Sequence, residues 1–196
     1  MKREDLLDLF RRCSALLEGH FRLSSGLHSP GYLQCALVLQ HPQHAAALGA
    51  ELAGTVRDLR PTTILSPALG GLIIGHEVAR ALGARAIFAE REDGALRLRR
   101  GFDLSEAERV LVVEDVVTTG GSTRETMQVA RAAGAQVVAA VAIVNRSGGT
   151  AELDVPLHAL LDLQLPTYDP AVCPLCAGGV PIQKPGSRQV AVAHDR

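Results

Sequence analysis

A repeated alternation of strand, loop and helix over residues 62–144 constrains the fold more than any other feature of this sequence. Four apolar runs short enough to be buried strands recur there, and helical spacing of apolar residues separates most of them. The strands are expected at 62–65, 84–89, 110–113 and 136–144, and the helices at 72–82 and 122–133. This order predicts an α/β fold, with a central parallel sheet, right-handed crossovers and flanking helices.

The segments outside this alternation have a different character. Apolar spacing predicts helices over 3–18 and 41–60, and the small polar residues of 20–40 predict a turn followed by a short strand or hairpin. A last strand is expected at 157–165, after which Pro, Gly and Cys are frequent and no period is visible. We therefore expect one domain, 1–196, in three parts: a small N-terminal hood, a core and a Cys-containing C-terminal extension, at about 1–40, 41–165 and 166–196.

Composition excludes several classes of protein. Hydrophobic residues make up 47 % of the chain but aromatic residues only 3 %, so the core must be aliphatic. A net charge of -1 argues against nucleic acid held by bulk charge. The chain lacks the apolar run of about 18 residues that a membrane span needs. With no signal-peptide core after Met1 and only four cysteines, the cytoplasm is the expected compartment.

Residues 109–123, RVLVVEDVVTTGGST, are expected to form the centre of a binding site. Glu114 and Asp115 directly follow an apolar strand, and a glycine-rich turn then opens a helix. Loop amides at a helix N-terminus suit a dianion. Carboxylates suit hydroxyl donors or a magnesium ion. The stretch therefore predicts a site for a ligand that carries both hydroxyls and a phosphate.

Two further loops are expected at the same edge of the sheet. Residues 66–71, SPALGG, follow one strand, and Arg146 follows another within the turn 145–149. Taken by itself, the 66–71 loop could be either an ordinary turn between a strand and a helix or a second anion-binding site. Ligands of parallel sheets bind outside the carboxyl ends of the strands, so the three loops together favour a single site.

Residues 90–103 predict a hairpin around the turn Asp93-Gly94. Arg97 and Arg99 alternate with leucines and therefore lie on one face of a strand. The acidic residues of the same segment nearly balance its basic ones, so a solvated surface hairpin is the alternative to a binding role. The arginines of this hairpin are Arg91, Arg97, Arg99 and Arg100.

Residues 112–122 closely resemble the phosphoribosyl pyrophosphate (PRPP) signature of the type I phosphoribosyltransferase family. The stretch is neither a Walker loop nor a dinucleotide-binding fingerprint. Around it, residues 20–34, 66–71 and 98–102 are similar to the hood, pyrophosphate loop and lid stem of the orotate phosphoribosyltransferases within that family. The segment 169–188 is similar to the tail of their longer bacterial form, and the likeness covers about residues 18–188.

The resemblance implies the type I phosphoribosyltransferase fold and transfer of ribose 5-phosphate from PRPP to orotate, within pyrimidine biosynthesis. The products would be orotidine 5'-monophosphate and pyrophosphate. It also implies Mg2+ as a cofactor, carried by PRPP, and a homodimer whose lid reaches the neighbouring subunit's site. Two alternatives stay open: a purine phosphoribosyltransferase, and a non-catalytic regulator of the same fold that senses PRPP or nucleotides.

The resemblance also implies the roles of individual residues. Glu114 and Asp115 would hold the ribose hydroxyls, Arg146 the orotate carboxylate, and Tyr32 would lie against the pyrimidine. Thr118 would contact both substrates. Arg99 and Arg100 are the predicted catalytic residues of the lid, and Arg91 the predicted lid contact to PRPP. The remaining PRPP-binding residues would be Ala68, Leu69, Gly70, Gly71, Val116, Val117, Thr119, Gly120, Gly121 and Ser122.

Cys173 and Cys176 form a Cys-Pro-Leu-Cys pair in the extension. One such pair supplies two ligands, whereas a structural zinc site wants four. His158, His194 or a second subunit could supply the others. Two reduced thiols in a turn are the simpler alternative.

Overall fold

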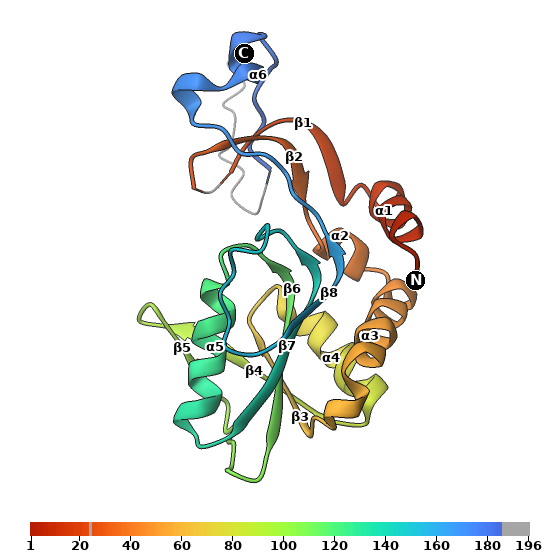
Figure 1. The fold of residues 1–196 in the computed structure, drawn as a ribbon, viewed down its shortest axis with the longest axis vertical. Helices are drawn as coiled ribbons and strands as arrows, with labels where there is room; N and C mark the ends of the chain where they lie inside the picture. The colour runs from red at the N-terminus through yellow and green to blue at the C-terminus, as the bar shows by residue number, and fades with distance from the viewer. Residues whose placement is uncertain (24, 186–196) are drawn as a thin grey trace, which may run out of the picture.

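The computed structural model describes residues 1–23 and 25–185, and its centre is a six-stranded sheet of order β5-β4-β3-β6-β7-β8 (Figure 1). Neighbouring strands are parallel except β5, which returns antiparallel to β4. The expected parallel α/β sheet is therefore confirmed. The strands are β3 (Thr63–Pro67), β4 (Arg85–Glu92), β5 (Ala95–Leu98), β6 (Arg109–Val117), β7 (Gln136–Asn145) and β8 (Leu157–Asp162).

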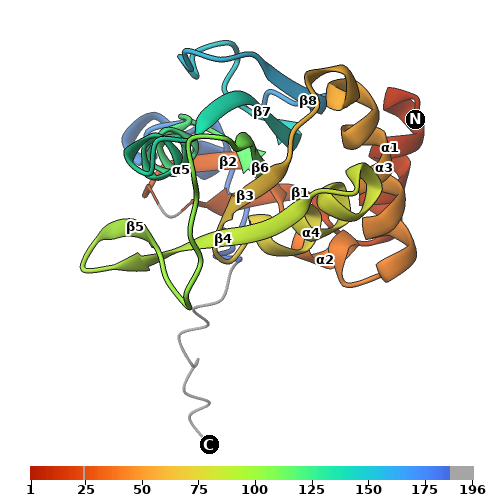
Figure 2. The ribbon, with the colours of Figure 1, turned by 90° about the horizontal axis from the view of Figure 1, so that it is seen from below.

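Helices cover both faces of this sheet (Figure 2). One face packs against α3 (Pro42–Val56) and α4 (Gly71–Leu82), and the other against α5 (Gly121–Ala132). Successive residues of β6 alternate between the two cores: Leu111 and Val113 face one, Val110 and Val112 the other. A strand buried on both faces needs an unbroken apolar run, which is why this segment lacks polar alternation.

The N-terminal segment forms α1 (Arg3–Arg12), the antiparallel hairpin of β1 (Leu16–Arg22) and β2 (His28–Leu33), and α2 (Ala36–Leu39). A short 3-10 turn, η1 (Arg57–Leu59), follows α3. The chain beyond β8 contains η2 (Pro170–Val172) and α6 (Pro174–Ala177).

That last segment runs along both edges of the hairpin. The amide of Arg22 donates to the Gln183 carbonyl (2.8 Å), and the amide of His28 donates to the Tyr168 carbonyl (2.9 Å). We call β1, β2, residues 23 and 25–27 between them, and residues 165–185 together the upper lobe; it stands apart from the six-stranded sheet (Figure 1). The division of the chain into hood, core and extension stays a prediction, but the structure lays the predicted extension against the hood.

The predicted helix over 3–18 is wrong beyond Arg12. Ser14 has a φ of 53°, a left-handed conformation that turns the chain. Leu16 and Leu17 then pair with Leu33 and Tyr32 in the hairpin. Adjacent leucines fit a helix face or a strand equally well, so spacing alone did not separate the two.

The prediction of a strand or hairpin through residue 40 is wrong at 36–39, which form α2, and α3 ends at Val56 rather than at residue 60. The other elements start and end close to their predicted positions. β6 is longer than expected and includes Glu114 and Asp115, and β8 stops at Asp162 rather than at 165. The hairpin at 90–103 is confirmed, since Asp93 and Gly94 both have positive φ between β4 and β5. Within the described part of the chain, every helix is too short or too polar to cross a bilayer.

Candidate functional site

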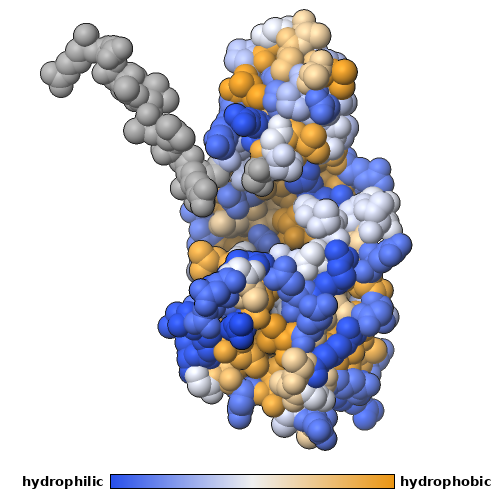
Figure 3. Space-filling view, turned by 90° about the vertical axis from the view of Figure 1, so that its left-hand side faces the viewer, coloured by the Kyte–Doolittle hydropathy of each residue, from blue (hydrophilic) through white to orange (hydrophobic). Residues whose placement is uncertain are grey.

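A cleft of about 960 Å³ opens between the upper lobe and the carboxyl ends of the central strands. In the space-filling view it is the hollow between the two parts of the molecule (Figure 3). We call its two sides the sheet wall and the lobe wall. The sheet wall comprises Thr118, Thr119, Arg146, Ser147 and Thr150; the lobe wall comprises Arg22, Leu23, Ser25, Gly26, Leu27, Tyr32, Leu165, Thr167, Lys184 and Pro185.

Two acidic side chains lie in β6 just before the sheet wall. Glu114 is only 6 % exposed. Burial, and secondarily the charge of Asp115, raises its pKa to about 8. Burial also raises the pKa of Asp115, although its carboxylate accepts a hydrogen bond from the Val116 amide (2.9 Å). Buried carboxylates with raised pKa values are stabilised by hydroxyl donors or by a cation, so this pair suits a polyhydroxyl ligand or a metal-bound one.

The turn after β6 presents backbone N–H groups at the start of α5. Gly120 precedes the helix with a φ of 73°, which glycine adopts without strain. The N–H groups of the first helical turn have no acceptor within the helix and carry the positive end of its dipole. Thr118 and Thr119 expose their side chains on the cleft beside them. This segment is built to bind an anion such as a phosphate.

The loop between β3 and α4 lies against the end of β6. A Cβ atom added at Gly70 would lie 2.7 Å from Asp115 Oδ1, and one at Gly71 would lie 2.8 Å from the Val113 carbonyl oxygen. The loop therefore approaches β6 as closely as only glycine allows. Because β3 and β6 are neighbours, the starts of α4 and α5 both lie at this edge of the sheet.

Arg146 brings a positive charge to the cleft. Among the described residues, its buried Nε has no hydrogen-bond partner. Burial lowers its pKa, and the neighbouring Cys35 and Tyr32 oppose that shift. The Arg146 amide donates to the Val117 carbonyl (2.7 Å), which holds the residue beside the anion-binding turn. A half-buried guanidinium whose buried Nε has no partner among the described residues favours a carboxylate or phosphate ligand.

The structure brings together most of the predicted site residues. Thr118, Thr119, Arg146 and Tyr32 line the cleft, while Glu114, Asp115 and the loop 68–71 lie at the neighbouring ends of β6 and β3. Tyr32 comes from β2 and lies beside Phe21, with 5.9 Å between ring centroids.

The arginines of the β4–β5 hairpin are not among the residues that line this cleft. Each of them instead pairs with a glutamate. The pairs are Arg91–Glu125 (3.0 Å), Arg97–Glu92 (3.8 Å), Arg99–Glu92 (3.2 Å) and Arg100–Glu90 (2.7 Å). A lid role for Arg91, Arg99 and Arg100 therefore stays a prediction.

Sequence reasoning missed several residues of the lobe wall. Lys184 reaches the cleft because residues 166–185 fold back along the hairpin, and no local pattern signals such a return. Arg22 and Leu27 flank the turn of the hairpin, and their position could have been inferred from Tyr32 on the adjoining strand.

Comparison with known proteins agrees with this geometry. The family model described as "Phosphoribosyl transferase domain" matches residues 37–164. The chain is 50 % identical over 190 residues to the orotate phosphoribosyltransferase of Desulforamulus reducens, covering 97 % of this chain and 100 % of that one.

Solved structures agree as well. The orotate phosphoribosyltransferase of Aeropyrum pernix superposes with a TM-score of 0.69 at 27 % identity, covering 81 % of this chain and 93 % of that one. The Mycobacterium tuberculosis enzyme in complex with PRPP superposes with a TM-score of 0.65 at 25 % identity, covering 82 % and 96 %. The sheet, the match to the family model and the near full-length identity together show that this chain has the type I phosphoribosyltransferase fold and belongs to the orotate phosphoribosyltransferase family.

Proposed function

We propose that this chain transfers the ribose 5-phosphate group of PRPP to orotate, forming orotidine 5'-monophosphate and releasing pyrophosphate in pyrimidine biosynthesis. The observation that carries the proposal is Arg146. This residue lines the cleft beside the turn at 118–122, which suits a phosphate, and its buried Nε has no partner in the described part of the chain. A planar carboxylate such as that of orotate matches a guanidinium fork.

The PRPP half of the site would use β6 and the two glycine-rich loops. Glu114 and Asp115 would accept hydrogen bonds from the ribose hydroxyls, which would satisfy two buried carboxylates. The amides and side chains of 118–122 would bind the 5'-phosphate, and those of 68–71 would face the pyrophosphate. Each charge-assisted hydrogen bond nets roughly 1.5–3 kcal/mol, so several such groups are needed for micromolar binding.

The orotate half would use Arg146, Thr118 and Tyr32. Arg146 would fix the carboxylate, and the ring of Tyr32 would lie against the pyrimidine. The attacking orotate nitrogen is anionic, so the reaction needs no strong protein base. Catalysis then rests on positioning the two substrates, stabilising the developing charges and excluding water.

Magnesium fits the oxygen chemistry of this site. The carboxylates of Glu114 and Asp115 are buried with raised pKa values, and Asp115 lies against the loop proposed for pyrophosphate. Carboxylate and phosphate oxygens are the ligands that Mg2+ prefers. We propose that the ion would be carried by PRPP, that the Asp115 carboxylate would lie near it, and that its charge would offset the negative charge of pyrophosphate.

The β4–β5 hairpin would act as a lid in a homodimer. Its arginines pair with glutamates at the outer edge of the sheet, from which they would reach a neighbouring subunit's site more readily than their own. A closing lid supplies charge to the leaving pyrophosphate and excludes water. Four free thiols fit the reducing environment of the cytoplasm, where we place the enzyme.

The test is a spectrophotometric assay of orotate consumption with PRPP and Mg2+, run beside adenine, hypoxanthine and uracil. We expect turnover of orotate alone, and dependence on both PRPP and the ion. Folded protein that consumes no orotate, or that consumes a purine base faster, would contradict the proposal.

A further inference from the structure

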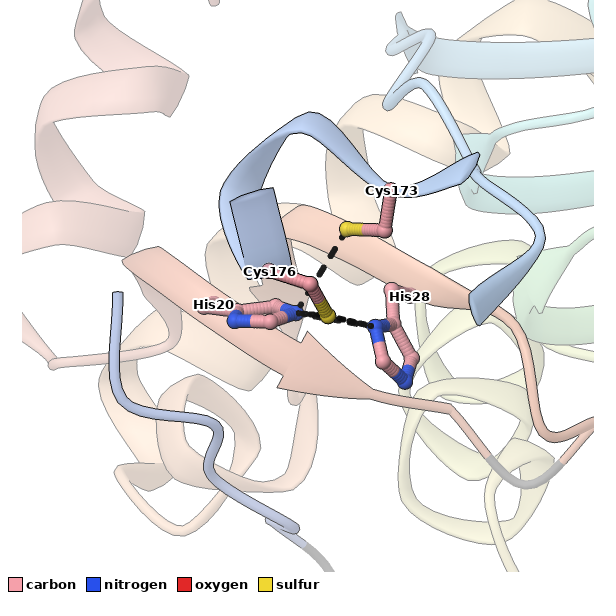
Figure 4. A group of neighbouring side chains, drawn as sticks. All are labelled: His20, His28, Cys173 and Cys176. Atoms are coloured by element: carbon pink, nitrogen blue, oxygen red, sulfur yellow. Dashed lines mark hydrogen bonds between the residues drawn. The ribbon is translucent and has the colours of Figure 1, made fainter. Parts of the chain in front are cut away.

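Four potential metal ligands meet in the upper lobe, and none of them is among the residues that line the cleft. His20 comes from β1, His28 begins β2, and Cys173 and Cys176 come from the turn around α6. One ligand atom from each side chain lies within 4.8 Å of all the others. Figure 4 shows the four side chains pointing toward one another across the gap between the hairpin and α6.

Three distances between these ligand atoms are close to those expected around a tetrahedral zinc ion. Zinc bonds of about 2.0–2.1 Å to nitrogen and about 2.3 Å to sulfur place N and S ligands about 3.6 Å apart and two nitrogens about 3.3 Å apart. Cys173 Sγ and Cys176 Sγ lie 3.6 and 3.7 Å from His20 Nε2, and Cys176 Sγ lies 3.3 Å from His28 Nδ1. The two ring nitrogens are 2.9 Å apart, so a slight separation of the rings would admit the ion.

Neighbouring groups orient the His20 ring for metal binding. His20 Nδ1 lies 2.8 Å from the Val180 carbonyl oxygen; donation there leaves the lone pair of Nε2 directed at the cluster. Such a contact to the second ring nitrogen is the usual support of a metal-bound histidine. His20, His28 and Cys173 are buried, whereas Cys176 is exposed and gives a route of entry. Two thiolates would neutralise Zn2+, so the loaded site would carry no net charge.

We propose that His20, His28, Cys173 and Cys176 bind one zinc ion and that this ion fastens the C-terminal segment to the β1–β2 hairpin. Four protein ligands leave no open position, so the site is structural rather than catalytic. The segment it fastens carries Lys184 and Pro185 of the lobe wall. Zinc would therefore hold the lobe wall of the cleft in place. This proposal holds whichever base the enzyme uses as its substrate.

Of the predicted partners of the cysteine pair, His158 lies on β8 and is not part of the cluster, and His194 lies outside the described residues. Two histidines of the hairpin, His20 and His28, lie beside the cysteine pair. The sequence analysis missed them because 153 positions separate His20 from Cys173.

The experiment measures zinc directly in the reduced, untagged full-length protein. Metal content is determined after gel filtration, and the chelator-treated protein is titrated with Co2+. We expect one zinc per chain, and with cobalt the visible bands of a tetrahedral ion together with a thiolate charge-transfer band. Removal of the metal should lower the melting temperature, and added zinc should restore it.

Variants then locate the ion. Cys176→Ser changes an exposed side chain and should leave the protein folded while abolishing retention of zinc; His28→Asn should abolish retention and change the cobalt spectrum. Cys13→Ser and His76→Asn, which change a cysteine and a histidine outside the cluster, should keep one zinc per chain. The proposal is overturned if reduced protein binds neither zinc nor cobalt, if Cys173 and Cys176 form a disulfide instead, or if both cluster variants retain zinc.

Discussion

The sheet wall of the cleft comes from continuous stretches of chain, whereas the lobe wall comes from segments that are far apart in the sequence. Glu114, Asp115 and the turn at 118–123 follow one another within β6 and the start of α5. In the upper lobe, by contrast, Ser29 Oγ donates to the Pro166 carbonyl (3.0 Å) across 137 positions of the chain. The acidic pair and the turn at 118–123 therefore belong to one local sequence motif. The lobe wall exists only when distant segments of the chain have packed together.

The two walls therefore offer different kinds of contact to the substrates. The sheet wall, together with Glu114 and Asp115 just before it, carries the groups proposed for phosphate, ribose and the orotate carboxylate, and all of them act through charge or hydrogen bonds. The lobe wall offers Tyr32 and apolar surface, with Lys184 and Arg22 at its edge. We therefore expect substitutions among these groups to cost more activity than substitutions in the lobe wall, and those at Arg146 and Asp115 each to affect one substrate.

The largest effect is expected from Arg146→Ala. Loss of a forked, charge-assisted contact should lower kcat/KM for orotate by about 100-fold or more. The dissociation constant of PRPP, measured by calorimetry, should stay within about threefold of wild type, because its ligands lie in the loops after β6 and β3. Arg131→Ala, which removes an arginine paired with Asp154 (2.8 Å), is the control. Equal weakening of both substrates would refute the role of Arg146.

Asp115→Asn should be the next most damaging change. It replaces a carboxylate acceptor by an amide at the proposed ribose contact, and we expect PRPP binding to weaken by about 30-fold. Binding of orotate to the PRPP-loaded enzyme should change little. Asp154→Asn alters an exposed aspartate and should have no effect on either substrate. Undiminished PRPP affinity in Asp115→Asn would remove this residue from the ribose site.

Arg99→Ala tests the lid, which neither wall contains. Turnover should decrease by about tenfold, because one charge that stabilises the leaving pyrophosphate is lost. PRPP should still bind, because Arg99 is not among the residues that line the cleft. Arg80→Ala on α4, an exposed arginine paired with Glu77 (2.7 Å), is the control. Unchanged turnover would take Arg99 off the list of catalytic residues.

In the lobe wall, Tyr32→Leu should raise the KM for orotate by about fivefold, the magnitude of a lost aromatic contact. Tyr32→Phe should behave like wild type, because the ring is retained. The other tyrosine of the chain, Tyr168, is not part of the cleft lining, and Tyr168→Leu serves as the matched control. If Tyr32→Leu lowered kcat/KM for orotate more than Arg146→Ala does, the lobe wall would contribute more to orotate binding than the sheet wall, against our expectation.

The smallest effect concerns stability rather than activity. Glu114 has a pKa of about 8 in the folded chain against an ordinary 4.5, so the folded state keeps a proton that the unfolded chain loses between these values. The stabilisation is therefore complete below pH 4.5 and is lost as the pH rises toward 8, by at most a few kcal/mol. Asp115 shifts in the same direction.

Melting temperatures of the ligand-free protein at mildly acidic and mildly alkaline pH measure this effect. Wild type should lose more stability on going to alkaline pH than Glu114→Gln, which cannot ionise. Glu152→Gln, an exposed glutamate outside the sheet wall, should keep the slope of wild type. Identical slopes for wild type and Glu114→Gln would show that this carboxyl is already ionised in the folded protein.

The sequence by itself determined the sheet and most of the sheet wall. Strand and helix periods differ, and apolar runs such as Val110–Val113 leave little choice when both faces of a strand are buried. The phosphate turn could be predicted because its glycines, hydroxyls and acids are neighbours in the chain. Even the position of Arg146 followed from the rule that parallel strands end at a common edge.

Only the tertiary structure decided the lobe wall and the cluster in the upper lobe. Leu16 and Leu17 suit a helix or a strand, and their pairing with β2 made the choice. His20 and His28 meet Cys173 and Cys176 because the chain returns to both edges of the hairpin after β8. Local propensity carries no information about such a return; the backbone hydrogen bonds and packing that fix it exist only once the chain has folded.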